Sequence, residues 1–282
     1  MKDKKKLWIM LPCALVLMAV GLTAWVLWAN TAIKRTDYTL QSARLPQAFD
    51  GFCIAQVSDL HNARMGEDNA DLLALLAEAE PDIIVITGDL IDANRTDTAV
   101  ALDFLQKAMQ IAPCYMITGN HESAIGRADY FAFEAEALAL GVQVLHDRAV
   151  TLERGGQSIV LLGLDDPNYE GMLPAPEEIR ALAGTDGFTI MLSHRPEHFD
   201  RYAAAGIDLT FSGHAHGGQF RLPLIGGLYA PGQGAFPEYD CGIYTYGQAS
   251  MVVSRGIGNS SFPLRLNNRP ELVVVTLTAQ QD

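Results

Sequence analysis

Two stretches decide the fold of this chain, PDIIVITGDL at residues 81–90 and CYMITGNHE at residues 114–122. In each, an apolar run typical of a buried strand ends at a glycine, and the polar side chain of Asp89 or Asn120 follows at once. Ligands in open α/β sheets bind at the carboxyl ends of the strands. The two stretches therefore predict a site at one edge of a sheet.

Three further stretches have the same construction, with the runs IAQV, FTIML and DLTF ending just before polar side chains. They contribute Asp59, His61, His194, His214 and His216. Together with Asp89 and Asn120, the set offers two carboxylates, one amide and four imidazoles. Divalent metals of intermediate softness favour these ligands, and a pair of metals needs a carboxylate that can bridge them. We therefore expect a two-metal hydrolase site.

The order of the elements predicts an α/β fold. Apolar and amphipathic runs alternate as strands at residues 52–57, 82–87, 114–118 and 142–145 and helices at 67–79, 96–109 and 128–140. This alternation favours parallel strands with helical crossovers. Beyond residue 148 we expect a hairpin at 149–164, strands at 188–192 and 207–211, and helices at 176–183 and 196–205. Two mixed sheets flanked by helices accommodate all of these elements.

The N-terminal segment predicts a membrane anchor. Residues 7–29 carry no charge, and this uncharged segment is long enough for a transmembrane helix. A cleaved signal peptide is the alternative. Four lysines precede this segment and only Lys34 and Arg35 closely follow it, so we expect a cytoplasmic N-terminus and an extracytoplasmic catalytic domain. We assign residues 1–35 to the anchor and 36–282 to the catalytic domain, with a polar linker at 30–46 running into an edge strand at 37–43.

Charge narrows the class of substrate. Residues 1–35 hold six of the 20 Lys and Arg and one of the 33 Asp and Glu, so the rest has 14 basic and 32 acidic residues, a net charge of −18. Such a surface repels polyanions, which argues against a nucleic-acid substrate. The four cysteines form no disulfide framework, and we expect Cys53 and Cys114 to be buried thiols.

The ordered motifs D-x-H, G-D, G-N-H-E, H and G-H-x-H resemble those of the calcineurin-like metallophosphoesterase superfamily, and the resemblance covers essentially everything after the anchor. It implies a four-layer αββα sandwich. The S-D-L-H motif, the G-H-x-H-G-G-Q run at 213–219 and the L-R-L-N-N-R-P-E run at 264–271 resemble a narrower group, membrane-associated phosphodiesterases of the YaeI and YkuE type. That group is associated with hydrolysis of UDP-2,3-diacylglucosamine in lipid A synthesis.

The resemblance also implies a role for each motif residue. Two divalent ions, Mn, Fe or Zn, would be held by Asp59, His61 and His216 at the first position and by Asn120, His194 and His214 at the second, with Asp89 bridging them. A metal-bound hydroxide would attack phosphorus, and His121 would protonate the leaving group. Alternatively, His121 only orients Asn120 or bonds to Glu122.

We therefore expect a membrane-anchored phosphodiesterase or pyrophosphatase acting on a phosphate ester, with a lipid-linked ester as one candidate substrate. One alternative is a phosphomonoesterase acting on nucleotides or phosphoproteins, and another is a non-catalytic metal-binding scaffold on the membrane. Two features stay open. Arg255, Arg265 and Arg269 could hold the phosphodiester or pair with acidic surface residues, and the apolar residues between 220 and 236 could face lipid or pack within a hairpin.

Overall fold

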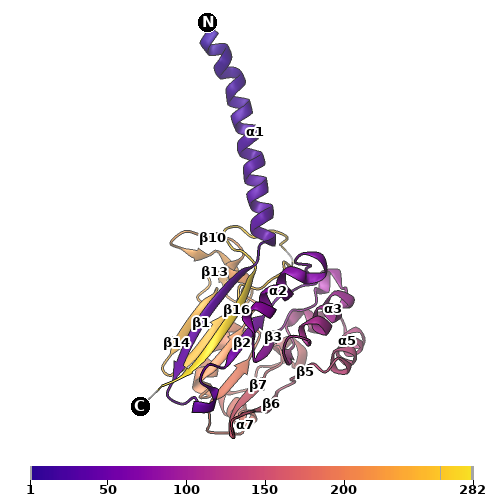
Figure 1. Ribbon diagram of the computed structural model, residues 1–282, viewed down its shortest axis with the longest axis vertical. Coiled ribbons are helices and arrows are strands. Elements are labelled where there is room, and N and C mark those ends of the chain that lie inside the picture. Colours follow the sequence, from indigo (N-terminus) through magenta and orange to yellow (C-terminus); the bar gives the residue numbers. More distant parts are fainter. Residues whose placement is uncertain (1, 261, 281–282) are drawn as a thin grey trace.

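The computed structural model describes residues 2–260 and 262–280. The catalytic body has two facing sheets at its centre, with helices on their outer sides, and one long helix projects from it (Figure 1). The first sheet has the order β1-β16-β2-β3-β4-β5, and all its neighbours are parallel except β16 and β2. Its strands are β1 Lys34–Ser42, β2 Cys53–Val57, β3 Ile83–Thr87, β4 Cys114–Ile117, β5 Gln143–Val144 and β16 Glu271–Ala279.

The second sheet has the order β14-β15-β9-β8-β7-β6 and is antiparallel only at its two ends. Its strands are β6 Arg148–Arg154, β7 Gln157–Gly163, β8 Thr189–Leu192, β9 Leu209–Ser212, β14 Gly242–Tyr246 and β15 Ala249–Val253. Two short ribbons lie between β9 and β14. They are formed by β10 Arg221–Leu222 with β11 Gly226–Gly227 and by β12 Tyr229–Ala230 with β13 Gly234–Ala235.

The helices divide between the two outer faces. The first sheet is covered by α2 Ala70–Ala79, α3 Thr98–Ala108 and α5 Arg127–Ala139, and the second by α7 Pro176–Ala183 and α8 Phe199–Ala204. The projecting helix is α1 Lys2–Thr31, and short helices α4 Asn120–Ala124 and α6 Pro167–Glu170 lie in loops. Single 3-10 turns occur at Gln47–Phe49, Glu67–Asn69, Ala93–Arg95, Pro196–His198 and His216–Gly218.

Strand alternation explains the layers. In β2, Ala55 and Val57 pack toward the helices, whereas Ile54 packs toward the second sheet. Because successive side chains of a strand point to opposite faces, each apolar strand contributes to two cores. Three cores result, one between the sheets and one under each helical layer. The expected four-layer αββα sandwich of two mixed sheets is thus confirmed.

The edge strand expected at residues 37–43 is confirmed, but it begins earlier, so the linker expected ahead of it within residues 30–46 is wrong. Helix α1 continues through Thr31, and β1 begins at Lys34 and pairs in parallel with β16 along its whole length. Although this segment is polar, Tyr38 and Leu40 pack against the core between the sheets, which is enough to fix it as an edge strand. Arg35 therefore lies within the sheet, and we propose that the anchor ends at Thr31.

A charged cluster joins the edges of the two sheets. His146 follows β5, and its Nδ1 lies 2.8 Å from Asp165 Oδ1, just after β7, while its Nε2 lies 2.8 Å from Glu134 Oε1 on α5. Burial acts to lower the pKa of His146, but its hydrogen bonds to the two carboxylates and their charges raise it to about 9. The imidazolium form of His146 therefore stabilises the fold.

This cluster predicts how stability depends on pH. Because the pKa of His146 is raised from 6.5, its stabilisation is fully present below about pH 6.5 and is lost as pH rises through about 9. The Tm of the protein should therefore fall more steeply between pH 7 and pH 10 than the Tm of a His146→Gln variant. His198→Gln is the control, since the pKa of His198 is lowered by burial, and it should follow the parent chain. Parallel Tm curves for all three proteins would contradict the assignment.

Candidate metal centre

All seven predicted metal ligands lie at one edge of the sandwich, in the loops that follow the carboxyl ends of five strands. Asp59 and His61 follow β2, Asp89 follows β3, Asn120 follows β4, His194 follows β8, and His214 and His216 follow β9. Two of these strands belong to the second sheet, so the site forms where both sheets end. The packing of the sheets thus brings together side chains that are up to 157 positions apart in sequence.

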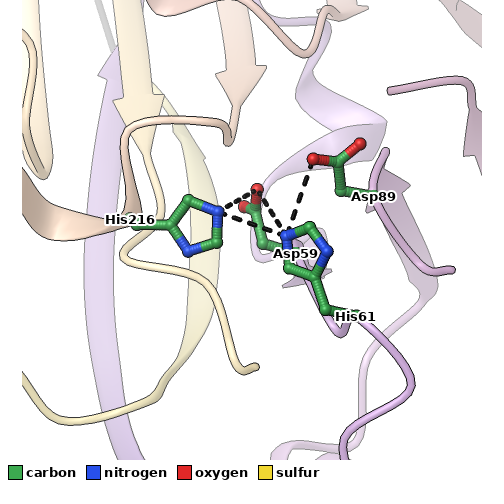
Figure 2. Close-up of side chains that lie close together, drawn as sticks. All are labelled: Asp59, His61, Asp89 and His216. Carbon is green, nitrogen blue, oxygen red and sulfur yellow. Dashed lines mark hydrogen bonds and ion pairs between the residues drawn. The ribbon is translucent and has the colours of Figure 1, made fainter. Parts of the chain in front are cut away.

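Four of these side chains form a first group of donors, Asp59, His61, Asp89 and His216, and Figure 2 shows that they point toward one another. His61 Nε2 lies 3.6 Å from Asp89 Oδ2 and 4.0 Å from Asp59 Oδ1. His216 Nε2 lies 3.4 Å from Asp59 Oδ1 and 3.2 Å from His61 Nε2. One donor atom from each side chain lies within 4.8 Å of all the others.

A second group lies on the other side of Asp89. His194 Nε2 lies 3.3 Å from Asp89 Oδ2, 3.1 Å from His214 Nδ1 and 3.3 Å from Asn120 Oδ1. On its other ring nitrogen, His194 Nδ1 hydrogen-bonds to the carbonyl of Thr87 at 2.7 Å, which fixes the ring. Asp89 is therefore shared by both groups, as the bridging role requires.

The protonation preferences of His61 and His216 fit a metal centre, whereas at His194 burial is outweighed by the charge of Asp89, which raises the pKa to about 10. Burial lowers the pKa of His61 to about 4 and holds that of His216 well below its usual range, so both imidazoles keep a free lone pair. Burial raises the pKa of Asp59 to about 6. For Asp89, burial acts in the same direction, but the neighbouring His194 holds its pKa well below the usual range. Lone pairs of nitrogen and oxygen thus face a common space, as the donor set of a divalent metal does.

The backbone of these loops is strained. Five of the seven predicted ligands have a positive φ, namely Asp59 (51°), His61 (48°), Asp89 (53°), His214 (66°) and His216 (47°). Residues other than glycine rarely adopt this left-handed conformation, and such residues cluster at functional sites. Backbone bonds hold the loops in place, including Asp59 N–H to Gly88 O at 3.1 Å and His61 N–H to Asp89 O at 3.0 Å.

Two glycines allow the loops to approach so closely. Gly88 has a φ of +87°, and a Cβ there would lie 2.7 Å from Gly119 Cα and 2.8 Å from His194 Nδ1. A Cβ on Gly213 would lie 2.6 Å from Asp59 Oδ2. Both positions thus require glycine, because the backbone passes close beside a functional side chain.

Glu122 is a buried support that sequence reasoning left without a role. Its carboxylate accepts hydrogen bonds from the N–H groups of Asp89 at 2.8 Å, Ile91 at 3.0 Å and Gly119 at 2.8 Å. Burial raises its pKa to about 7. Glu122 thereby fastens the loop after β3 to the loop after β4. The feature of the sequence that could have revealed Glu122 is its position directly after the polar pair Asn120 and His121, at the start of a short helix.

His121 lies at the cavity with a defined ring orientation. The N–H of Ala93 donates to His121 Nδ1 at 2.9 Å, so the neutral ring carries its proton on Nε2. That nitrogen lies 3.1 Å from Ser260 Oγ, and both residues line the cavity. Asp92 Oδ1 lies 3.4 Å from Nδ1. Since the Glu122 carboxylate is used by backbone N–H groups, the alternative in which His121 bonds to Glu122 is not supported.

Two arginines near the site hold protein groups. Arg195 forms a two-pronged pair with Asp166, at 2.6 and 3.1 Å, and its Nη1 lies 2.9 Å from His214 Nε2. Arg265, 1% exposed, donates to the carbonyls of Arg255 and Gly258 at 2.5 Å each. Sequence reasoning missed Arg195. Arg265 was considered for phosphate binding, but its guanidinium is engaged by these two carbonyls.

The two donor groups open into a cavity of about 300 Å³. Its lining includes the polar side chains of Asp89, Asn120, His121 and Gln219. It also includes Tyr229, Pro231 and Phe262, which contribute apolar surface. The cavity can therefore receive a phosphate ester whose neighbouring part is apolar.

The fold and the arrangement of donors define a metallophosphoesterase. Residues 53–218, more than half of the chain, match the family described as calcineurin-like phosphoesterase, and the chain belongs to this family. It is 33% identical to the uncharacterized metallophosphoesterase YkuE of Bacillus subtilis, with 87% of this chain and 85% of YkuE covered. It is 30% identical to the phosphodiesterase YaeI of Escherichia coli, with 80% and 82% covered.

A solved structure shares the fold. The sulfate thiohydrolase SoxB of Thermus thermophilus superposes with a TM-score of 0.51 at 14% identity, covering 83% of this chain and 57% of SoxB. At this identity the likeness concerns the fold alone. The family relationship rests on the sequence matches and agrees with the expected superfamily.

Replacing Glu122 should weaken the whole site. In Glu122→Ala, three buried N–H groups lose their acceptor, and each such loss costs about 1–3 kcal/mol. We expect a lower free energy of unfolding in urea and a lower metal content by elemental analysis. The matched control is Glu136→Ala, an exposed glutamate on α5 that should leave both quantities unchanged. Equal stability of the two variants would show that Glu122 is not a support.

Proposed function

We propose that this protein is a membrane-anchored phosphodiesterase that uses two divalent metal ions. Asp59, His61 and His216 would hold the first ion and Asn120, His194 and His214 the second, with Asp89 between them. The observation that carries this proposal is the membership of Asp89 in both donor groups. A shared carboxylate is what a pair of ions about 3.5–4 Å apart requires.

Bound divalent ions would supply electrophilic stabilisation of the phosphoryl oxygens and activate a water nucleophile. The residues of the chain do the rest. Asn120 contributes a neutral oxygen, which leaves more positive charge at the second position than a carboxylate would. His121 presents Nε2 at the cavity wall, where its imidazolium form would pass the Nε2 proton to the departing oxygen and be left as the neutral ring, with Asp92 Oδ1 3.4 Å from Nδ1.

The membrane anchor is supported by the length and exposure of α1. Its segment Pro12–Thr31 has a mean hydropathy of 1.9 and is 6% buried, and the helix stands clear of the catalytic body (Figure 1). The four lysines at its start favour an N-terminus in the cytoplasm and an extracytoplasmic domain. With that orientation, a lipid-linked phosphodiester fits better than a cytoplasmic nucleotide-linked lipid such as UDP-2,3-diacylglucosamine.

A phosphodiester substrate is supported by the relationship to YaeI and by the apolar surface in the cavity lining. The test is hydrolysis of bis-p-nitrophenyl phosphate by the full chain with Mn, Fe or Zn, compared with p-nitrophenyl phosphate. We expect faster cleavage of the diester. Faster cleavage of the monoester would favour a phosphomonoesterase, and no cleavage with any metal would favour a non-catalytic scaffold.

Removing the shared carboxylate should empty both positions. In Asp89→Asn, we expect the metal content to fall from two ions per chain to less than one, with loss of diester cleavage. Asp103→Asn, on the half-exposed surface of α3, is the matched control and should keep both ions. Two ions retained in Asp89→Asn would refute the bridging role.

Removing the proton donor should separate metal binding from turnover. In His121→Ala, we expect two bound ions and a fall in kcat of about 10²–10⁴-fold for diesters with alkoxide leaving groups. The fall should be much smaller when the leaving group is p-nitrophenolate, because that anion departs without a proton. An equal fall for both substrates would assign His121 an orienting role instead.

A further inference from the structure

A group of exposed apolar side chains borders the mouth of the catalytic cavity. Three lie on the hairpin that β10 and β11 form, and three lie on the segment that precedes β16. Together they are called the apolar rim: Leu222, Leu224, Ile225, Phe262, Leu264 and Leu266. Leu224 is completely exposed and Ile225 is 60% exposed. Phe262 also lines the cavity itself, so the rim continues into the site.

The base of α1 is fastened to one half of this rim. Asn30 pairs with the backbone of Arg265 in both directions, through Arg265 N–H to Asn30 Oδ1 at 2.7 Å and Asn30 Nδ2 to Arg265 O at 3.0 Å. Arg269 donates to the carbonyls of Ala32 and Ile33 at 2.8 and 2.9 Å. Its guanidinium also lies 4.8 Å from the ring centre of Trp28. The helix therefore has a fixed attachment to the domain.

The other half of the rim is tied to the same segment. Arg221 N–H donates to Leu266 O at 3.0 Å, and the side chain of Gln219 donates to Phe262 O at 3.1 Å and to Leu264 O at 2.6 Å. The hairpin, the segment before β16 and the base of α1 thus form one connected unit. In Figure 1 the β10 hairpin lies at the level of this helix base, on the side of the domain from which α1 projects.

The position of α1 sets the level of the membrane surface. Trp25 and Trp28, at the end of the apolar run, are 40% and 52% exposed, and tryptophan is enriched where a transmembrane helix leaves the lipid. Asn30 lies two residues further on, about 3 Å along the helix axis. Because β1 begins at Lys34, there is no spacer that could hold the domain away from the bilayer. The rim therefore lies at the level of the headgroups.

We propose that the apolar rim inserts into the bilayer beside α1, so that the catalytic cavity opens onto the membrane interface and takes its substrate from the lipid phase. The occupant of the rim is the bilayer that α1 spans. A second copy of the chain fits poorly, because copies anchored in one membrane would all turn this face toward the lipid. The part of the inference that concerns substrate rests on the proposed function, and it narrows the substrate to phosphodiesters carried by membrane lipids.

Insertion is tested without reference to activity. The full chain is placed in phosphatidylcholine vesicles as Leu224→Trp, with Met172→Trp as the matched control, since Met172 is 83% exposed beyond α6. The three native tryptophans all lie in α1, so the parent chain gives the background. We expect brominated lipids to quench the added emission of Leu224→Trp and not that of Met172→Trp. Equal, unquenched emission from both added tryptophans would overturn the proposal.

Entry of lipid substrate into the cavity from the bilayer is tested with the double variant Leu224→Asp and Ile225→Asp. Met172→Asp is the control. Two charges at the interface oppose insertion, so cleavage of hexadecyl p-nitrophenyl phosphate in vesicles should fall by about 10-fold. Cleavage of soluble bis-p-nitrophenyl phosphate should stay within about 2-fold, because neither residue lines the cavity. Unchanged cleavage of the lipid substrate would overturn the access route. If the parent chain cleaves neither diester, the proposed function fails, while the insertion result still stands.

Discussion

The structure depends on the burial of two carboxylates, Asp59 and Asp89, at the edge where both sheets end. Each is almost completely excluded from solvent, and they lie among four imidazoles. Buried charges of like sign are costly unless cations or protonated groups compensate them. In the protein itself His194 provides this compensation, since burial opposes its charge but Asp89 raises its pKa to about 10. The proposed divalent ions would do so far more strongly, which links the fold to metal binding.

Bringing these donors together requires backbone that the chain would not adopt on its own. Five donors have a left-handed conformation, at a cost of about 1–2 kcal/mol each. The surrounding structure opposes that cost through Glu122, through bonds between neighbouring loops, and through the three cores that hold the strands rigid. Rigid strands and strained loops together hold the donors in position. Such fixed positions reduce the reorganisation needed when a phosphate ester arrives.

The same geometry orients the catalytic cavity relative to the proposed membrane anchor. The cavity mouth, the apolar rim and the base of α1 share one side of the domain, and the segment before β16 connects all three. Arg265 lies at the centre of this connection. Its backbone pairs with Asn30, and its Nη2 lies 3.4 Å from Nδ1 of His216. The proposed anchor is therefore joined to the catalytic domain through contacts that reach one of the predicted metal ligands.

The sequence by itself determined the α/β class, the strands that carry the motifs and the seven side chains that the structure brings together, because each motif follows a buried strand and strand ends meet at one edge. It did not determine the supports, since the partners of Glu122, Arg195 and Arg265 are backbone groups and side chains remote in sequence. The edge strand around Tyr38 was expected, but its start at Lys34 was not, because only pairing with β16, far along the chain, adds the preceding polar residues to it. The two donor groups that share Asp89 were implied by the family resemblance, and the structure brings their side chains together. Tertiary structure alone decided that the apolar rim lies beside α1, because that depends on contacts between segments far apart in the sequence.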